Sequence, residues 1–441
     1  MEKNDIEKLR QLVLKGHAIC TDSRQTKPGD IFFALKGENF NGNKFALQAL
    51  ENGCALAVVD EPIALGNKKL IQVDNVLRTL QQLSHFHRQQ FNLPLIGITG
   101  TNGKTTTKEL THAVLASTFR TLATKGNLNN HIGVPLTLLD LTAAHEIAII
   151  EMGANHMGEI GELSLLANPG YGLITNIGKA HLEGFGSVEN IIKTKTELYD
   201  HVKKAGGQIF VNGENSLLTE KAQGAELITY GKGSQNHCAG AITREKPFME
   251  IDFMVNKPLG KALAGTKGSI QTRLVGAFNF ENVMAALTIG LYFGVSPDNA
   301  VEAIEAYQPS NSRSQLIDNG RNVILLDAYN ANPTSMAAAI GNFAGFGQSP
   351  RALILGDMLE LGETSLEEHR QIIKLITENH FDLSILVGPE FMAVAQPGEN
   401  CLVFEHSFQA TEWLKAKNLE GYHFLVKGSR GIKMEKVLEA L

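Results

Sequence analysis

The first part of the chain alternates between helical spacing of apolar residues and short apolar runs. Helical spacing over residues 6–14 and again over 77–86 predicts two helices. The short runs, which predict strands, are 31–35, 55–59 and 70–73. The second helix gives way to Pro94, which disfavours helical geometry in the residue before it. We therefore predict a small α/β unit that ends near residue 92.

Short apolar segments then alternate with helical ones. The predicted strands are 95–98, 147–150, 173–177 and 209–211. Strands separated by helices favour a largely parallel sheet covered by helices on both faces. Between residues 232 and 275 the period changes to two, with alternation over 249–255 and a second run over 269–274. This pattern predicts an antiparallel ribbon added to the same unit.

A second linker, Pro309-Ser310-Asn311-Ser312, precedes another set of alternating strands and helices. The predicted strands are 323–326, 352–355, 385–387 and 423–426. The fold class is therefore α/β with three domains. Their predicted bounds are 1–92, 93–308 and 309–441.

Composition and charge narrow the function further. The 441 residues are enough for two or three separate cores. The net charge of −6 provides no basic field for a phosphate backbone, so we expect no nucleic-acid partner. The four cysteines lie far apart, which suits a reducing compartment. No run reaches about 18 apolar residues and no signal peptide is evident, so we expect a cytoplasmic protein without a membrane span.

The strongest motif is an apolar strand that runs into glycines, a Gly-Lys-Thr triplet and a helix, over residues 95–107. Glycines let backbone N–H groups turn toward an anion, Lys104 neutralises phosphate, and the Thr105 hydroxyl can hold Mg²⁺. The strict pattern requires glycine at position 98, where this chain has Ile98. The alternative is a glycine turn in an ordinary strand-to-helix connection. We predict a variant loop that binds a nucleoside triphosphate.

Two polar residues follow later predicted strands. Glu151 comes directly after the run 147–150, and His181 lies beyond the run 173–177. Parallel sheets assemble ligand sites at the carboxyl ends of their strands, so we expect both residues near the phosphate loop as Mg²⁺ ligands. Taken singly, Glu151 also fits a solvated strand end and His181 a structural histidine, and imidazole is the less typical ligand for Mg²⁺.

Together these segments resemble the Mur ligases, the ATP-dependent amide-bond ligases of peptidoglycan precursor synthesis, over nearly the whole chain. The loop TGTNGKTTT is highly specific for that family. Residues 327–333, 355–362 and 427–431 resemble the C-terminal motifs of the branch that adds D-alanyl-D-alanine. The branch that adds the third amino acid carries Asp-Asn-Pro-Arg when it selects diaminopimelate, and this chain lacks that motif.

The resemblance implies a UDP-sugar-binding first domain, a central P-loop ATPase domain and a Rossmann-like third domain that contacts dipeptide and ATP. The implied catalytic residues are Lys104, Glu151, His181, Lys195 and Arg313. The implied ATP contacts are Gly100, Thr101, Asn102, Gly103, Lys104, Thr105, Thr106, Asn279, Asn282, Arg313 and Asp327. The implied metal ligands are Thr105, Glu151, His181 and a carbamylated Lys195. The implied substrate contacts are Ser23, Arg24, Lys36, Asn130, Tyr329, Asn330 and Arg430. Phe278 stands where related ligases often have histidine.

The implied cofactors are ATP and Mg²⁺, and the implied substrates are UDP-N-acetylmuramoyl-tripeptide and D-alanyl-D-alanine, joined through an acyl phosphate. We expect a monomer. A ligase of the preceding step and a folylpolyglutamate synthase-like ligase are alternatives, although the N-terminal Asp22-Ser23-Arg24 argues against the latter. A nucleotide-dependent switch without ligase activity is the alternative from a different class, and it explains only the loop.

Overall fold

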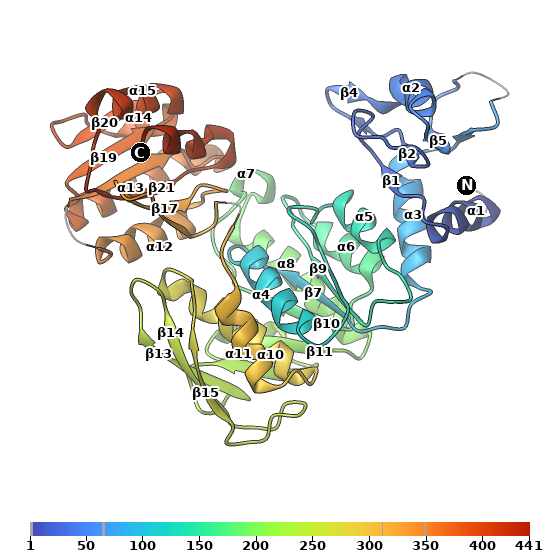
Figure 1. Cartoon of the computed structure of the whole chain (residues 1–441), viewed down its shortest axis with the longest axis horizontal. Helices are drawn as coiled ribbons and strands as arrows, with labels where there is room; N and C mark the ends of the chain where they lie inside the picture. The colour runs from blue at the N-terminus through green and yellow to red at the C-terminus, as the bar shows by residue number, and fades with distance from the viewer. Residues whose placement is uncertain (1–2, 64–66, 311, 348–349) are drawn as a thin grey trace.

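The computed structural model describes residues 3–63, 67–310, 312–347 and 350–441, which form three α/β units in chain order (Figure 1). The blue first unit and the red third unit lie on opposite sides of the central unit in this view. This arrangement confirms the predicted fold class. None of the helices in the described ranges is both long and apolar enough to cross a membrane.

The first unit is built on a parallel four-stranded sheet with the order β1-β2-β5-β6. Its strands are β1 Ile19–Cys20, β2 Ile31–Phe33, β5 Leu56–Val59 and β6 Leu70–Gln72, and β3 Lys36–Gly37 pairs with β4 Phe40–Asn41 in a small hairpin. Its helices are α1 Lys3–Leu14, α2 Ala46–Glu51 and α3 Val76–Arg88. The Asn75 side chain caps α3 by accepting from Arg78 N over 2.8 Å, which fixes where that helix begins.

The central unit contains a nine-stranded sheet with the order β15-β14-β13-β12-β11-β10-β7-β9-β8. The strands are β7 Leu95–Thr99, β8 Thr121–Ala123, β9 Ile147–Glu151, β10 Tyr171–Ile174, β11 Gln208–Asn212, β12 Glu226–Gly231, β13 Cys238–Arg244, β14 Glu250–Val255 and β15 Lys267–Gln271. Neighbouring strands from β13 through β12, β11, β10, β7 and β9 to β8 pair in parallel. Strand β14 pairs antiparallel with β13 and with β15. The predicted parallel sheet and its antiparallel ribbon are therefore confirmed.

Helices cover both faces of this sheet. They are α4 Lys104–Ala116, α5 Gly133–Leu139, α6 Glu159–Ala167, α7 Leu182–Phe185, α8 Val188–Lys204, α9 Ser216–Lys221, α10 Phe280–Tyr292 and α11 Pro297–Ala306. Because successive strand residues point to opposite faces, Ile149 packs in a core with α4 and α10, whereas Ile150 packs in a second core with α6 and α8. Burial on both faces explains the continuous apolar runs of the sequence.

The third unit has a six-stranded sheet with the order β16-β17-β21-β18-β19-β20, of which only β16 pairs antiparallel in the described residues. The strands are β16 Gln315–Asp318, β17 Val323–Asp327, β18 Arg351–Gly356, β19 Leu383–Val387, β20 Cys401–Phe404 and β21 His423–Lys427. The helices are α12 Pro333–Ala344, α13 Ser365–Asn379, α14 Pro389–Val394 and α15 Ser407–Lys417.

Several elements differ from the sequence-based expectation. The strand predicted over 173–177 spans Tyr171–Ile174 instead, because the polar residues after Ile174 turn toward the phosphate loop. Strands β8, β12, β13, β16 and β20 were not predicted, since they are short or mix polar with small residues. Helix α11 ends at Ala306 and β16 begins at Gln315, so the predicted linker 309–312 falls between these two elements. Within it, Asn311 lies outside the described residues.

Helix α3 joins the first two units through side-chain packing. It contacts α1 on one side and α5 and α6 of the central unit on the other. Leu80 and Leu83 share one buried cluster with Leu139 of α5. Near the end of α3, the buried Arg88 guanidinium donates to the carbonyl of Ala167 at the end of α6, over 3.0 Å. The predicted boundary at residue 92 thus follows a helix whose core extends to α5 of the central unit.

Candidate active site

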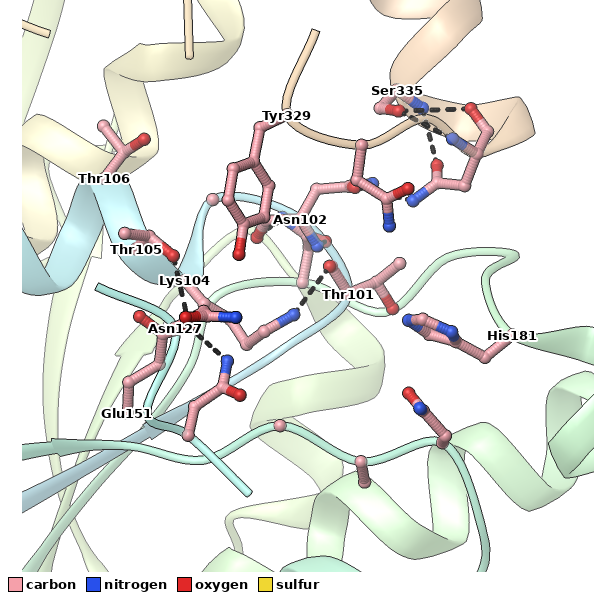
Figure 2. A pocket seen from close by; sticks show the side chains of 18 of the residues that line it. Thr101, Asn102, Lys104, Thr105, Thr106, Asn127, Glu151, His181, Tyr329 and Ser335 are labelled. Atoms are coloured by element: carbon pink, nitrogen blue, oxygen red, sulfur yellow. Dashed lines mark hydrogen bonds between the residues drawn. The ribbon is translucent and has the colours of Figure 1, made fainter. Parts of the chain in front are cut away.

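A cavity of about 840 Å³ lies where the three units meet. Its wall includes Leu77 and Gln81 of α3, the loop between β7 and α4, and six residues between 327 and 335 of the third unit. Figure 2 shows Asn102 and Lys104 of the loop together with Tyr329 and Ser335 of the third unit. Most of the predicted site residues line it, namely Thr101, Asn102, Gly103, Lys104, Thr105, Thr106, Asn130, Glu151, His181, Asn279, Asn282, Arg313, Asp327, Tyr329 and Asn330. The predicted residues that do not line it are Gly100, Lys195, Arg430, Ser23, Arg24 and Lys36.

The phosphate loop depends on glycine at two positions. Gly100 has φ of +146° and Gly103 has φ of +78°, both in the region that L side chains rarely adopt. A Cβ at Gly103 would lie 2.5 Å from Oδ1 of Asn282. Gly103 sits at the N-terminus of α4, so the first N–H groups of that helix face the cavity and suit an anion.

Lys104 folds back over the loop. Its Nζ donates to the carbonyl of Gly100 over 2.7 Å and to that of Thr101 over 3.0 Å. The pKa of Lys104 is lowered to about 8. Desolvation is the largest cause, the charge of Glu151 opposes it, and the charge of Arg313 adds to it. The two carbonyl contacts are weak partners for an ammonium group compared with phosphate oxygens. The lysine is therefore placed to exchange them for a phosphate.

Asn102 at the tip of the loop is held from two units. Its backbone N–H donates to Oδ1 of Asn176 over 2.9 Å, and its carbonyl accepts from the Thr175 hydroxyl over 2.7 Å. Its side-chain Oδ1 accepts from Nδ2 of Asn332, the residue that caps α12 in the third unit, over 2.8 Å. Sequence reasoning missed these three partners. The polar pair directly after the apolar end of β10 was the available signal for Thr175 and Asn176.

Glu151 is almost fully buried, with 1% of its surface exposed. Its Oε1 accepts from the Thr105 hydroxyl over 3.2 Å and from Nδ2 of Asn129 over 2.8 Å. Its Oε2 is also buried, and no hydrogen-bond partner reaches it from the described residues. A buried carboxylate oxygen without a partner beside a hydroxyl suits Mg²⁺, which prefers hard oxygen ligands. Glu151 and Thr105 thus fit the predicted metal site.

His181 reaches the cavity from the opposite side, at the N-terminus of α7 (Figure 2). Its Nδ1 is hydrogen-bonded to the Glu360 carboxylate of the third unit. Across the described chain, no group of three His, Cys, Asp or Glu residues is arranged to hold a metal. A cation here would therefore be coordinated by few protein ligands and would need phosphate oxygens to complete its shell.

The comparisons with known proteins agree on one family. Residues 98–290 match the family model described as Mur ligase middle domain, residues 312–430 match "Mur ligase, glutamate ligase domain", and residues 15–88 match "Mur ligase family, catalytic domain". The UDP-N-acetylmuramoyl-tripeptide--D-alanyl-D-alanine ligase of Bacillus subtilis is 35% identical, with 96% of this chain and 93% of that protein covered. This chain belongs to the Mur ligase family.

Two further relatives extend the agreement. The Escherichia coli protein of the same name is 33% identical, with 96% of this chain and 93% of that protein covered. The crystal structure of MurF from Acinetobacter baumannii superimposes with a TM-score of 0.85 at 32% identity, covering 96% of this chain and 92% of that one. The similarity to this family therefore spans all three units of the chain.

In this Mur ligase, Lys195 lies on α8 and is buried, with 3% of its surface exposed. Its Nζ lies 5.9 Å from the centre of the Phe185 ring. Desolvation, and then the charge of Lys104, lower the pKa of Lys195 well below its ordinary value. The Lys195 amine therefore loses its proton more easily than the amine of a lysine on the surface.

Asn279 and Asn282 line the cavity but are also tied to the protein. The Asn282 amide donates to Oδ1 of Asn279 over 2.9 Å and accepts from the Thr107 hydroxyl of α4 over the same distance. The Asn279 amide donates to the carbonyl of Val275 over 3.0 Å. Asn282 therefore braces α4 against α10, and Asn279 holds the Asn282 side chain in place.

The third unit contributes charged side chains around Tyr329. The Arg313 guanidinium lies 3.6 Å from the centre of the Tyr329 ring, and its Nε is buried without a partner among the described residues. Arg430 lies 5.4 Å from the same ring. Asp327 accepts from Nζ of the buried Lys427 over 2.6 Å. Sequence reasoning missed Lys427, which lies at the end of β21 and lines the cavity.

The predicted substrate contacts of the first unit lie away from this cavity. The exposed Arg24 is paired with Asp22 over 2.8 Å. Lys36 is paired with Asp60 over 2.9 Å and with Glu61 over 3.0 Å. All of these charges are on the first unit, so a ligand that reaches them and the phosphate loop must be long.

Proposed function

We propose that this Mur ligase joins D-alanyl-D-alanine to UDP-N-acetylmuramoyl-tripeptide, with ATP converted to ADP and phosphate. The product is the UDP-muramoyl pentapeptide of peptidoglycan synthesis. The observation that supports the chemistry is that one cavity contains the phosphate loop, the buried carboxylate of Glu151 and charged side chains of the third unit. The printed names of the relatives support the substrate pair.

The first step activates a carboxyl group. The carboxylate of the tripeptide attacks the γ-phosphorus of ATP, ADP leaves, and an acyl phosphate forms. Lys104 and Arg313 stabilise the negative charge of the transferred group, since each has donors that its protein contacts leave free or weakly bound. The α4 N-terminus adds backbone N–H donors at the phosphates.

The second step forms the amide bond. The amine of D-alanyl-D-alanine attacks the acyl carbonyl, a tetrahedral intermediate forms, and phosphate leaves with the electrons of the broken C–O bond. We assign the dipeptide to the side of the cavity lined by Asn130, Tyr329 and Asn330. Arg430, beside the Tyr329 ring, would pair with the dipeptide carboxylate.

Mg²⁺ would be held by Glu151 and the Thr105 hydroxyl, with His181 as a third ligand. When bound, it would screen the charge of the phosphates. The buried Oε2 of Glu151 supports this assignment, because a carboxylate oxygen without a partner in the protein has a high desolvation cost. The Asn129 amide orients the carboxylate by donating to its other oxygen.

Lys195 would act as a carbamate. Its lowered pKa supplies the uncharged amine that adds CO₂, and the nearby Lys104 would offset the new negative charge. The resulting anion would sit where a protonated lysine has no acidic partner among the described residues. Mass measurement under native conditions would detect the added CO₂.

We assign the uridine diphosphate end of the first substrate to Ser23, Arg24 and Lys36, and the ATP nucleoside to Asn279, Asn282 and Asp327. The four cysteines are free, which fits the reducing cytoplasm where we place the protein.

The test is an ADP-release assay with mass detection of the product. The proposal expects turnover with UDP-N-acetylmuramoyl-tripeptide and D-alanyl-D-alanine together, and almost none with a single amino acid as acceptor. Turnover of UDP-N-acetylmuramoyl-dipeptide with a single amino acid would instead show that the protein is the ligase of the preceding step. ADP release with a folate would show that it is a folylpolyglutamate synthase. ATP hydrolysis without any ligated product would favour the switch.

A further inference from the structure

His181 and Glu360 form a contact between two units of the fold. His181 precedes α7 in the central unit, and Glu360 lies in the loop after β18 in the third unit. The histidine Nδ1 is hydrogen-bonded to the carboxylate. In Figure 2 the His181 ring points into the cavity. No hydrogen bond within the described part of the chain reaches its other nitrogen, Nε2.

The backbone of both partners adopts a conformation that only glycine tolerates well. His181 has φ of +51° and Glu360 has φ of +63°. Left-handed backbone is unfavourable for a residue with a side chain. Such conformations persist where the surrounding structure holds them, and they cluster at functional sites. Here a backbone bond from Glu183 N to the carbonyl of Glu360, over 3.2 Å, ties the two turns together.

The loop that presents Glu360 is rigidly supported from within the third unit. The buried Asp357 carboxylate accepts from the backbone N–H groups of Glu390 and Phe391, each over 2.9 Å. The backbone N–H of Leu359 donates to the Ser429 hydroxyl over 2.9 Å. The position of the Glu360 carboxylate is thus fixed by the body of the third unit and moves with it.

We propose that Glu360 is a positioning residue that fixes the His181 ring with Nδ1 toward the third unit and Nε2 toward the cavity. A carboxylate accepts a hydrogen bond only from a protonated nitrogen, so Nδ1 carries a proton, and whenever the ring is neutral Nε2 keeps its lone pair. Carboxylates orient metal-binding histidines in the same way. Because Glu360 belongs to the third unit, His181 is fully oriented only when that unit is docked. The role of Nε2 as a metal ligand rests on the proposed function, whereas the orientation of the His181 ring by Glu360 does not.

The chain offers a matched control for docking alone. Lys179, two residues before His181, is paired with Glu368 of α13 over 2.6 Å. This ion pair joins the same two units without touching His181. Glu368→Gln therefore weakens docking, whereas Glu360→Ala weakens docking and also removes the acceptor from His181. Glu360→Gln keeps an oxygen that accepts from Nδ1 and serves as the conservative variant.

The experiment is ¹⁵N NMR of the full chain labelled at histidine, with the His181 signals assigned by their loss in His181→Asn. At a pH where the ring is neutral, we expect the Nδ1-protonated tautomer in the unmodified protein, in Glu368→Gln and in Glu360→Gln, and a mixture of tautomers in Glu360→Ala. Turnover should fall by about 10- to 100-fold in Glu360→Ala and by no more than about threefold in Glu368→Gln. Thermal melts of each variant report whether it folds.

An Nε2-protonated His181 in the unmodified protein would overturn the proposal. So would an unchanged tautomer in Glu360→Ala together with a loss of turnover equal to that of Glu368→Gln, because Glu360 would then act in docking alone. The NMR measurement needs no substrate. If the tautomers behave as expected but no variant ligates the dipeptide, the proposed function fails and the orientation of His181 stands.

Discussion

The hydroxyl of Thr105 and the carboxylate of Glu151 are joined by a hydrogen bond of 3.2 Å, although the two residues lie at the start of α4 and the end of β9. Strands β7 and β9 are neighbours in the sheet, so the segments that follow them meet at one edge. The bond leaves Oε2 of Glu151 buried without a partner among the described residues. This geometry makes Glu151 the most sensitive test of the metal site.

Replacing Glu151 with glutamine should lower turnover by about 100-fold, equivalent to ~3 kcal/mol of transition-state stabilisation. The amide keeps the shape of the side chain and an acceptor for Thr105, but it is a poor ligand for Mg²⁺. The rate should be measured across Mg²⁺ concentrations. Glu146→Gln, just before the same strand and half-exposed, is the control and should change little. Equal rates for the two variants would contradict the assignment.

Lys104→Ala should lower the rate of ligation by about 100- to 1000-fold, because the transferred phosphoryl group loses the cation of the phosphate loop. ADP release measured with both substrates is the readout. Lys125→Ala removes an exposed lysine paired with Asp140 and should leave the rate nearly unchanged. A folded Lys104→Ala protein with full activity would contradict the role of the loop.

Gly103→Ala should destabilise the fold more than Gly126→Ala. Both glycines have positive φ, but only a Cβ at Gly103 meets another atom, Oδ1 of Asn282 at 2.5 Å. Asn282 is held by Thr107 and Asn279 and yields little. We expect the free energy of unfolding to drop by at least about 1 kcal/mol more for Gly103→Ala, from urea denaturation. Equal losses would mean that Asn282 moves aside freely.

Asn332→Ser should raise the KM for ATP by about fivefold. Serine keeps the cap of α12, but its shorter side chain lacks the terminal amide that donates to Asn102, and a hydrogen bond is worth about 1 kcal/mol. The double variant with Asn102→Ala should be no worse than the more affected single variant, since both remove the same bond. Additive effects would show that the two residues act independently.

Cys238 should resist alkylation in the folded protein. Its side chain is fully buried, and desolvation raises the pKa of its thiol to about 12. The thiolate is the reactive form, and at pH 8 it is roughly one part in 10⁴ at such a pKa. Iodoacetamide followed by peptide mass analysis should label Cys238 only after denaturation. Raising the pH from 7 to 9 should not change this, because both values lie far below the pKa.

Much of the architecture was predictable because both faces of the main sheets are buried. Strand β9 is an apolar run up to Glu151, the residue that ends the strand and belongs to the site. The strands that escaped prediction include β13, whose sequence CAGAITR contains small and polar residues. One of its ladders is antiparallel, and pairing with β14 stabilises it where its own composition does not.

The candidate site was predictable only in part. Glu151 directly follows its strand, so its position could be inferred from the apolar run alone. His181 was expected at the same edge, but the direction of its side chain could not be inferred, because β10 ends at Ile174 and the intervening turn is fixed by contacts with Thr101 and with Glu360 of another unit. Asn332 likewise acquires its contact with Asn102 only through the docking of two units. Long-range contacts of this kind leave no periodic signal in the sequence.

Helix α3 has a practical consequence for dissecting the chain. Its inner face fills a cluster that also contains Leu139, and Arg88 supplies donors to the carbonyl of Ala167. A fragment that starts after residue 92 would expose the apolar side of α5 to water and leave that carbonyl unsatisfied. Such a truncated protein should aggregate on expression. A cut within 307–314 would keep both cores of the central sheet whole, but it would expose Val275, which is buried in the core of the third unit.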